Sequence, residues 1–330
     1  MSGHPGRPAR ILVTGAGGFV GRHMLVALRA AFPEAVLVGT ARTGRAERVQ
    51  GVDEVVALDL DEPSGLLDAV ATARPDAVMH LAARADVGAS FRNPMAFWRT
   101  NLMGTVALGE AVLRATPRAT FILASSGEVY GLAFRAKHPV HENSMLMPAN
   151  PYAASKAAAD LAIGEIALRG LRAVRLRPFN HTGPGQRDGF VVSSFAHQIA
   201  LIEAGRQKPV LRTGALDRWR DFLDVRDVCA AYVAALSQAN SLVPGVVLNV
   251  CSGKPRRIGD ILDRLLSLSS VAVEVMQEAA RLRPTDVEHV VAEGSRGRTL
   301  LNWAPRIDWD ETLGDLLASW RQTVKAAGPS

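Results

Sequence analysis

Two short segments of the chain carry residue types that could handle a carbonyl group. Tyr152 and Lys156 stand four residues apart, so on a helix both would project from one face. Ser126 follows an apolar run, residues 120–124, that is typical of a buried strand. Brought together, a phenol, an ammonium group and a hydroxyl could transfer a proton to or from a carbonyl oxygen while a hydride moves at its carbon.

Lys156 is expected to act on Tyr152 through its charge. A unit charge about 4 Å away, at an effective dielectric near 20, is worth roughly 4 kcal/mol. That energy corresponds to about three pK units. The sequence therefore predicts that the pKa of Tyr152 falls from about 10 toward neutrality, and that Ser126 holds the same substrate oxygen.

Alternating strands and helices must position these groups. Strands are expected at residues 10–14, 35–39, 55–58, 77–81, 120–124, 173–176 and 246–251, with helical patterns such as 23–31 and 101–115 between them. Fully apolar strands separated by helices predict a parallel sheet that is covered on both faces.

The pattern changes after residue 179, where Gly and Pro gather before an amphipathic stretch at 190–204. We therefore expect an α/β fold, a Rossmann-type doubly wound parallel sheet with a smaller C-terminal substrate-binding lobe. The NAD(P)-binding domain is expected to comprise residues 1–178 and 222–252. Residues 179–221 and 253–330 are expected to form the lobe.

A glycine-rich turn at residues 14–21 follows the first predicted strand and precedes a helix. Its GxxGxxG spacing allows a tight turn, close approach of a pyrophosphate and close packing of helix on strand. A tight turn without a ligand is the alternative, but the strand-to-helix context favours a dinucleotide site. The residues expected to bind the cofactor there are Gly15, Gly17, Gly18, Phe19, Val20 and Gly21.

The end of the second predicted strand bears on which dinucleotide is bound. Arg42 and Arg45 lie there, with no acidic residue before Glu47. Because an acid would hold a free ribose 2′-hydroxyl and arginine suits a 2′-phosphate, we expect NADP(H) rather than NAD(H). The alternative is that both arginines are solvated loop residues.

Two further strand ends are candidates for cofactor contact. Asp59 and Leu60 could reach the adenine, although an exposed capping aspartate is an equal alternative for Asp59. Leu81, Ala82 and Ala83 are small or apolar residues after the fourth strand and would allow the middle of the cofactor to approach closely.

Together these segments resemble the extended short-chain dehydrogenase/reductases, in their nucleotide-sugar branch, over nearly the whole chain. The matching segments are TGAGGFVG at 14–21, HLAA at 80–83, SSGEVYG at 125–131, NPYAASK at 150–156, RPFNHTGPGQ at 177–186, RDFLDVRDV at 220–228 and RPTD at 283–286. Within that branch, residues 177–186 followed by Phe-Val-Val at 190–192 are similar to the GDP-4-keto-6-deoxy-D-mannose reductases.

The resemblance implies a reaction and a substrate. The implied reaction is hydride transfer from NAD(P)H to the C4 ketone of a GDP-6-deoxyhexulose, giving GDP-D-rhamnose. Asn180, Arg220 and Arg283 fall where this family contacts the nucleotide diphosphate, and guanidinium groups suit diphosphate oxygens. The alternative for the arginines is an ordinary surface or ion-paired role, and His181 is expected to be structural. The resemblance also implies a homodimer formed through paired helices.

Gly127 and Glu128 favour reduction over dehydration. The related 4,6-dehydratases carry an Asp-Glu pair after the active-site hydroxyl, since eliminating water needs both a base and an acid. Here Gly127 occupies the Asp position and only Glu128 remains. Glu128 could still serve as a catalytic base or bind sugar hydroxyls, and Gly127 with Ser126 is expected to border the substrate.

Composition limits the remaining alternatives. The formal net charge is +6, but the basic residues are scattered without a Lys/Arg block, so we expect an anionic small substrate and no nucleic acid. No apolar run suggests a membrane span or a signal peptide, and Cys229 and Cys251 lack metal-site spacing, so a cytoplasmic protein without a metal is expected. A nucleotide-sugar C4 epimerase, a 4,6-dehydratase and a non-catalytic NADP-binding scaffold remain the alternatives.

Overall fold

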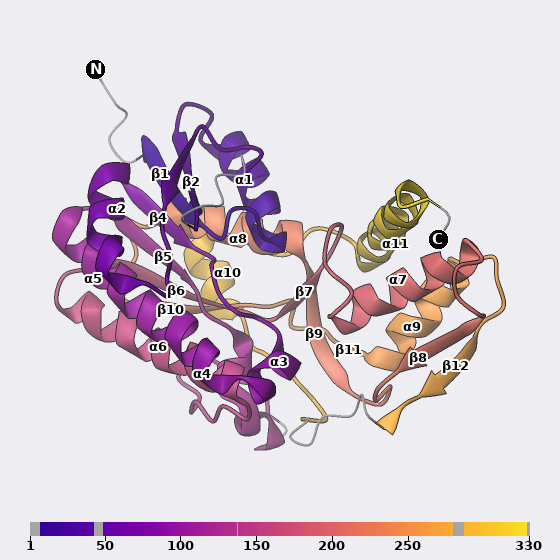
Figure 1. Ribbon diagram of the computed structural model, residues 1–330. Coiled ribbons are helices and arrows are strands. Elements are labelled where there is room, and N and C mark those ends of the chain that lie inside the picture. The colour runs from indigo at the N-terminus through magenta and orange to yellow at the C-terminus, as the bar shows by residue number, and fades with distance from the viewer. Residues whose placement is uncertain (1–6, 43–48, 137, 280–286, 329–330) are drawn as a thin grey trace.

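The computed structural model describes residues 7–42, 49–136, 138–279 and 287–328. Figure 1 shows these residues as two bodies side by side, which we call the sheet half and the lobe. The sheet half holds a seven-stranded sheet between helices, and the lobe holds two small sheets with three helices.

All seven strands of the large sheet run parallel in the order β10-β6-β5-β4-β1-β2-β3. They are β1 (Arg10–Thr14), β2 (Val36–Ala41), β3 (Glu54–Ala57), β4 (Ala77–His80), β5 (Thr120–Ala124), β6 (Arg172–Pro178) and β10 (Val246–Val250). The doubly wound parallel sheet predicted from the sequence is confirmed. β1 and β5 have the predicted bounds, and the other strands differ from the prediction at their ends.

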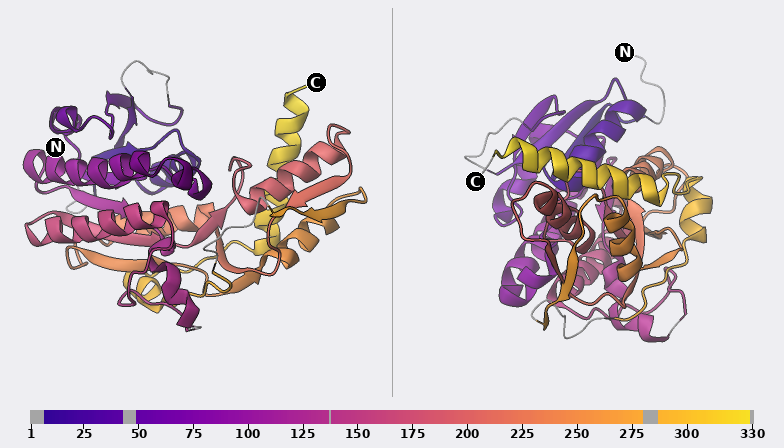
Figure 2. Two further views of the ribbon diagram at one scale, coloured as in Figure 1. Left: turned by 60° about the horizontal axis from the view of Figure 1, so that its bottom comes forward. Right: turned by 90° about the vertical axis from the view of Figure 1, so that its right-hand side faces the viewer.

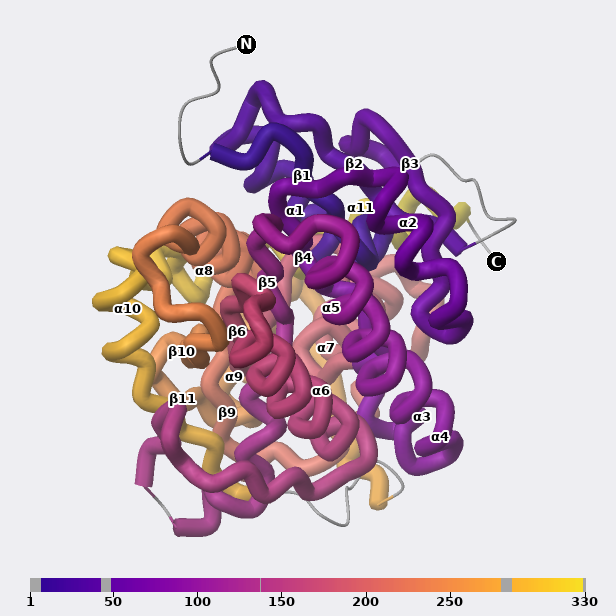
Figure 3. The backbone as a smooth tube through the Cα atoms, turned by 90° about the vertical axis from the view of Figure 1, so that its left-hand side faces the viewer, coloured from indigo at the N-terminus to yellow at the C-terminus, as the bar shows by residue number. Residues whose placement is uncertain are grey.

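Helices cover both faces of this sheet because its strands are apolar on both faces. On β1, Ile11 and Val13 join the core on one face, whereas Leu12 joins the core on the other. The first face is covered by α1 (Phe19–Ala31), α8 (Val225–Ser237) and α10 (Ser295–Leu301). The second face is covered by α2 (Leu66–Ala73), α5 (Gly104–Ala115) and α6 (Pro151–Leu168), and Figure 3 shows α5 and α6 lying alongside each other.

The strand order reverses direction between β1 and β4. The chain runs from β1 outward to β3 and then returns to β4 on the other side of β1. Ligands of open α/β sheets bind at such a point, outside the carboxyl ends of the strands. Short elements lie after those ends: η1 (Pro63–Gly65), α3 (Val87–Arg92), α4 (Pro94–Phe97), η2 (Trp98–Met103, a π-helical turn) and η3 (Gly127–Ala136).

The lobe faces this carboxyl edge and has its own apolar core. Its three-stranded sheet has β9 (Trp219–Asp224) between β7 (Asn180–Thr182) and β11 (Pro255–Arg257), and its two-stranded sheet pairs β8 (Val210–Thr213) with β12 (Glu274–Gln277). The helices are α7 (Val191–Glu203), α9 (Ile258–Ser267) and α11 (Trp309–Ala326), and α11 crosses the lobe against α7 (Figure 2). Phe195, Leu211, Leu262 and Leu316 meet in the lobe's core.

The predicted partition of the chain into two domains stays a prediction. One segment from the residues assigned to the lobe packs on the sheet half instead: Leu301 of α10 and Trp303 belong to the core cluster that contains α1 and α8. The Trp303 indole donates a hydrogen bond to the backbone oxygen of Asp227 at 3.1 Å. Among the described residues, no helix is both long and apolar enough to cross a membrane.

Candidate active site

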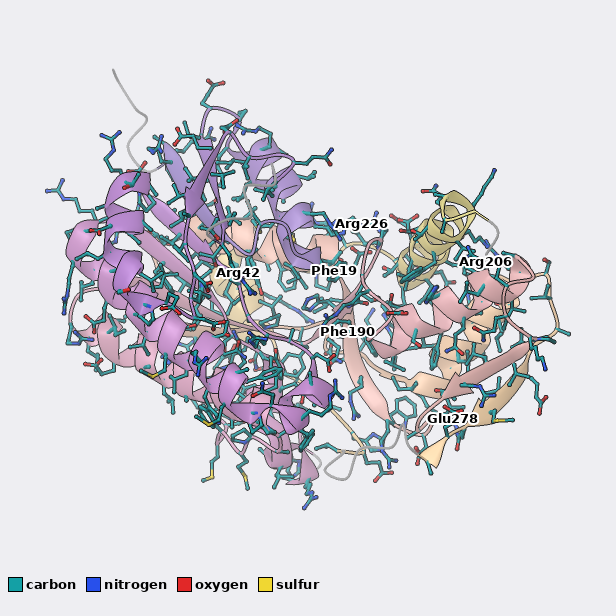
Figure 4. All side chains as sticks on the ribbon, viewed as in Figure 1. Phe19, Arg42, Phe190, Arg206, Arg226 and Glu278 are labelled. Carbon is teal, nitrogen blue, oxygen red and sulfur yellow. The ribbon has the colours of Figure 1, made fainter. Side chains whose placement is uncertain are left out.

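A cavity of about 1020 Å³ lies between the carboxyl edge of the sheet and the lobe. Its sheet wall comes from the glycine-rich turn, the ends of β4 and β5 and the start of α6. Its lobe wall comes from β7, the start of α7 and the ends of β8 and β9. Figure 4 shows Phe19 and Phe190 in the region between the two bodies. The volume suits a ligand larger than most single drug-sized molecules.

The glycine-rich turn is shaped so that backbone borders the cavity. Gly15 has φ +72°, and a Cβ there would lie 2.9 Å from the backbone nitrogen of Ala82. A Cβ on Gly21 would lie 2.1 Å from the backbone oxygen of Gly15. Gly18 is the N-cap residue of α1, which therefore starts at the cavity. A dinucleotide fits this site, because side chains are absent where its diphosphate would approach the backbone.

His80 joins the ends of the first and fourth strands. Its Nδ1 lies 2.8 Å from Thr14 Oγ1, and its Nε2 lies 2.9 Å from Thr105 Oγ1. Burial, with the nearby charge of Lys156, lowers the pKa of His80 to about 3, so the ring is neutral. The Thr14 hydroxyl also accepts a hydrogen bond from the Ala82 backbone at 3.2 Å. Leu81, Ala82 and Ala83 are thereby fixed against the turn, and all three line the cavity.

Helix α6 brings the predicted pair to the cavity. The Asn150 side chain caps the helix by accepting a hydrogen bond from the Ala153 backbone at 2.8 Å. Tyr152 and Lys156 then lie one turn apart, and both line the cavity with Ser126. Lys156 Nζ donates to the backbone oxygen of Ala124 at 2.5 Å. The structure therefore brings the three predicted groups together.

The predicted lowering of the Tyr152 pKa is wrong. Burial raises the pKa of Tyr152 to about 12, hydrogen bonding to Ser126 offsets part of this rise, and the Glu128 charge adds to it. Burial also lowers the pKa of Lys156 to about 8, opposed by the charge of Asp160. The physical reason is that burial is the largest contribution to the pKa of Tyr152, and the Lys156 ammonium is engaged with a backbone carbonyl. Tyr152 therefore stays protonated and can act as a proton donor.

A buried ion cluster lies behind the pair. Asp160, one turn after Lys156, is fully buried and accepts two hydrogen bonds from Arg177, each of 3.0 Å. Arg175 donates a third hydrogen bond at 3.0 Å. Although burial opposes it, these arginines lower the pKa of Asp160. The arginine of the RPFN motif therefore supports α6 from behind and does not line the cavity.

Gly127 is packed against an aromatic ring. A Cβ added at Gly127 would lie 3.0 Å from three atoms of the Phe179 ring. Glu128 lines the cavity, and its backbone nitrogen donates to Ser126 Oγ at 3.1 Å. A side chain at position 127 would therefore require the Phe179 ring to shift by a few tenths of an ångström. In this chain position 127 carries no carboxylate, and Glu128 is the acidic residue next to it.

The predicted substrate-binding residues lie on the lobe wall as far as they are described. Asn180 and Arg220 both line the cavity. Arg220 Nη1 donates to the backbone oxygens of Trp219 at 2.8 Å and Glu288 at 3.4 Å. Arg283, with the rest of the RPTD segment, lies outside the described residues. His181 also lines the cavity, and its Nδ1 lies 2.9 Å from the backbone oxygen of Phe179, which supports a structural role.

Four predicted cofactor contacts do not line the cavity: Gly17, Arg42, Asp59 and Leu60. Leu60 is buried against Gly104, and Asp59 Oδ1 accepts a hydrogen bond from the Asp61 backbone at 3.0 Å. Arg42 is exposed just after β2, and Arg45 lies outside the described residues. Their contact with a cofactor therefore stays a prediction.

Sequence reasoning missed two parts of the site. Asn101 is fully buried, and its side-chain amide donates to Ser155 Oγ and to the Arg84 backbone oxygen, each at 3.0 Å. Asn101 thereby connects the segment after β4 to α6. An asparagine within a helical sequence pattern does not by itself indicate such a connection. Arg212 and Arg218 add two more cations to the lobe wall. Among the described residues, no group of three acidic, Cys or His side chains is placed to hold a metal ion.

Comparison with known proteins identifies the family of the chain. The family model described as GDP-mannose 4,6 dehydratase matches residues 12–316. The GDP-6-deoxy-D-mannose reductase of Pseudomonas aeruginosa is 38% identical to the chain, over 96% of this chain and 98% of that protein. The UDP-glucose 4-epimerase of Azospirillum brasilense is 30% identical, over 96% of this chain and 93% of that protein.

Solved structures show the same likeness. The structure of RMD from Pseudomonas aeruginosa complexed with NADPH superposes with a TM-score of 0.82 at 36% identity, covering 96% of this chain and 99% of that one. A putative epimerase from Burkholderia cenocepacia gives a TM-score of 0.83 at 32% identity, covering 97% of this chain and 100% of that one.

Proposed function

The chain belongs to the GDP-mannose 4,6-dehydratase family, within the nucleotide-sugar branch of the extended short-chain dehydrogenase/reductases, and from this premise we propose that it is an NADPH-dependent 4-ketoreductase. The substrate is GDP-4-keto-6-deoxy-D-mannose and the product is GDP-D-rhamnose. The observation that carries this choice within a family named for dehydration is Gly127. This glycine, which packs against Phe179, stands where the dehydratases carry an aspartate, so Glu128 has no neighbouring carboxylate at position 127.

The chain's own residues supply the proton and the orientation. NADPH, when bound, would supply the hydride that C4 accepts and would become NADP⁺. Tyr152, protonated because its pKa is raised to about 12, donates its proton to the C4 oxygen. Ser126 holds that oxygen by a hydrogen bond, and the Lys156 ammonium stabilises the phenolate until water returns the proton. One C–H bond and one O–H bond form, so the ketone becomes an alcohol. Glu128 binds sugar hydroxyls beside Ser126.

The cofactor is held by the sheet wall. The turn residues Gly15, Gly18 and Gly21 give the diphosphate close access to backbone, and Phe19 and Val20 line the same part of the cavity. Tyr152 and Lys156 hold the reacting half. Arg42 binds the 2′-phosphate, which is the basis for preferring NADPH over NADH.

The substrate's diphosphate is held by the lobe wall, through Asn180, Arg220 and Arg283. The cationic character of that wall supports this assignment, because Arg212 and Arg218 line it as well.

A C4 epimerase is the second candidate function, since the chain is 30% identical to a UDP-glucose 4-epimerase. An idle NADP-binding scaffold is disfavoured, because binding alone does not need Ser126, Tyr152 and Lys156 together.

One assay separates these functions. The purified protein is given GDP-4-keto-6-deoxy-D-mannose and NADPH, and NADPH oxidation is measured against alcohol formed. The reductase consumes one NADPH per product, whereas an epimerase turns over without net oxidation and a dehydratase acts on GDP-mannose. Parallel assays with the UDP-linked and dTDP-linked keto sugars test the nucleotide. Absence of NADPH oxidation with every keto sugar would refute the proposal.

We also propose that the protein acts in the cytoplasm as a homodimer joined through α5 and α6. Apolar side chains on α6 support this, since Leu161 is 60% exposed and Leu168 is 90% exposed. Both cysteines are buried and free, as expected for a reducing compartment. Light scattering of the wild type and of a Leu161→Glu, Leu168→Glu variant tests the dimer, and an unchanged dimer in the variant would exclude this interface.

A further inference from the structure

Tyr232 of α8 is a second tyrosine at the cavity, and the mechanism does not use it. It is 2% exposed, belongs to the core cluster on the α1 face of the sheet, and lines the cavity. Cys229, one turn earlier on α8, lies with its Sγ 3.8 Å from the backbone oxygen of Val20. This face of α8 is therefore packed beneath the start of α1, and Figure 1 shows the two helices side by side.

The Tyr232 hydroxyl makes no hydrogen bond within the described part of the chain, and it is not sealed off from the cavity. A buried tyrosine hydroxyl ordinarily has a partner. Tyr130 illustrates the ordinary case, because its hydroxyl accepts from Arg177 at 3.0 Å and donates to Asn249 at 2.7 Å. An almost fully buried phenol without a hydrogen-bond partner among the described residues, on a residue that lines the cavity, indicates a partner that arrives with a ligand.

The position of Tyr232 identifies which part of a ligand it meets. Helix α8 packs against β5, which ends beside Ser126, and against β7, which begins at Asn180. The Tyr152 and Tyr232 phenols are close enough to interact electrostatically. Tyr232 reaches the cavity from the α1 face of the sheet, whereas Tyr152 reaches it from the α6 face. The two phenols therefore border the reactive end of the cavity from opposite sides.

We propose that the Tyr232 hydroxyl hydrogen-bonds the nicotinamide half of the cofactor, through its carboxamide or its ribose, and holds the ring in position for hydride transfer. This inference rests on the proposed function. The cofactor must run from the glycine-rich turn to the carbonyl at Tyr152, so its nicotinamide half lies between the α1 face and that carbonyl. Tyr232 lines the cavity from that α1 face and supplies a buried hydroxyl there.

Tyr232→Phe tests the proposal, because it removes the hydroxyl and keeps the ring. Without cofactor, the melting temperature should stay unchanged or rise slightly, since no hydrogen bond within the protein is lost. The Kd for NADPH, measured by calorimetry without sugar substrate, should rise about fivefold to tenfold. The Kd for 2′,5′-ADP, which lacks the nicotinamide half, should match that of the wild type.

Tyr130→Phe is the matched control. Its hydroxyl is bonded within the protein and does not line the cavity, so this variant should melt at a lower temperature and keep the wild-type Kd for NADPH. An unchanged Kd for NADPH in Tyr232→Phe would overturn the inference. So would an equal loss of 2′,5′-ADP binding, a lower melting temperature without cofactor, or an effect confined to the KM for the sugar. Failure of the wild type to bind NADPH would instead refute the proposed function.

Discussion

The sheet wall of the cavity contains closely packed backbone at the glycine-rich turn, whereas the lobe wall carries Arg212, Arg218 and Arg220. On the sheet wall, Gly15 and Gly21 leave no room even for a Cβ. On the lobe wall, Arg212 lies 2.6 Å from Glu278, and Arg218 lies 2.7 Å from Asp217. A wall of packed backbone is fixed before a ligand arrives, but a wall of ion-paired arginines must exchange its partners to bind a diphosphate.

Because of this difference, we expect the sheet wall to position the reacting groups and the lobe wall to bind the charged part of the substrate. Chemistry needs groups that are placed within fractions of an ångström, and the packed sheet wall provides this through α6 and the strand ends. Recognition of a charged substrate tolerates movement, because several guanidinium groups can share one diphosphate. Changes on the sheet wall should therefore be severe, and single changes on the lobe wall should be mild.

Tyr152→Phe should give the largest effect, because it removes the proton donor from the rigid wall. We expect kcat to fall about 1000-fold, within the usual range for loss of a general acid. The Kd for NADPH should change far less, since the ring and Lys156 remain. Single-turnover kinetics with GDP-4-keto-6-deoxy-D-mannose measure the chemical step directly. Retention of more than a tenth of the wild-type rate would show that another group donates the proton.

Gly21→Ala should be nearly as severe, because the added Cβ would meet the Gly15 backbone oxygen at 2.1 Å. The turn must shift, so we expect a loss of about 2.7 kcal/mol in NADPH binding, roughly 100-fold in Kd, together with a lower melting temperature.

Gly314→Ala is the control from the lobe. Gly314 also lies within a helix, α11, but no atom lies within 4 Å of an added Cβ. The variant should gain about 1 kcal/mol of unfolding free energy and bind NADPH normally. Equal effects of the two substitutions would contradict the distinction between the walls.

The pH dependence should be governed by Lys156, because burial lowers its pKa to about 8 whereas that of Tyr152 is raised to about 12. The Lys156 ammonium is lost as the pH rises through 8, so kcat/KM should fall about tenfold per pH unit above that value. Between pH 8 and the ordinary value of 10.5, the unfolded chain binds more protons at Lys156, so this group's contribution to the unfolding free energy rises with pH.

A Lys156→Arg variant checks the assignment. Arginine keeps its charge throughout this range, so the fall in kcat/KM above pH 8 should disappear even if the maximal rate is lower. If the fall remains unchanged in the variant, Lys156 is not the group that titrates.

The sheet wall was predictable from the sequence because local rules determine it. Apolar strands, the glycine spacing at 15, 18 and 21 and the four-residue interval between Tyr152 and Lys156 each act over a few residues. Parallel strands then bring these segments to one edge without further information. The seven-stranded sheet and the meeting of Ser126, Tyr152 and Lys156 followed from these rules.

Contacts between distant residues could not be predicted in this way. No pattern of neighbouring residues in the sequence indicates that Phe179 packs against Gly127, or that Arg220 donates a hydrogen bond to the Glu288 backbone oxygen. The Tyr152 pKa was mispredicted for the same reason, since a pairwise charge estimate omits the burial that the whole cavity imposes. Tyr232 was overlooked because an aromatic residue within an apolar helix resembles core.

Arg220→Ala should have the smallest effect and tests the lobe wall. Arg212 and Arg218 line the same wall, so they can take over part of the diphosphate's charge. We therefore expect the KM for the GDP sugar to rise about fivefold, close to 1 kcal/mol, with kcat and the Kd for NADPH almost unchanged. Arg206→Ala is the control, because Arg206 lies at the far end of the lobe (Figure 4) and donates to the Val324 backbone oxygen at 2.8 Å. That variant should keep the wild-type KM. If Arg220→Ala instead lowered kcat 100-fold, the lobe wall would be as finely positioned as the sheet wall, and the contrast between them would fail.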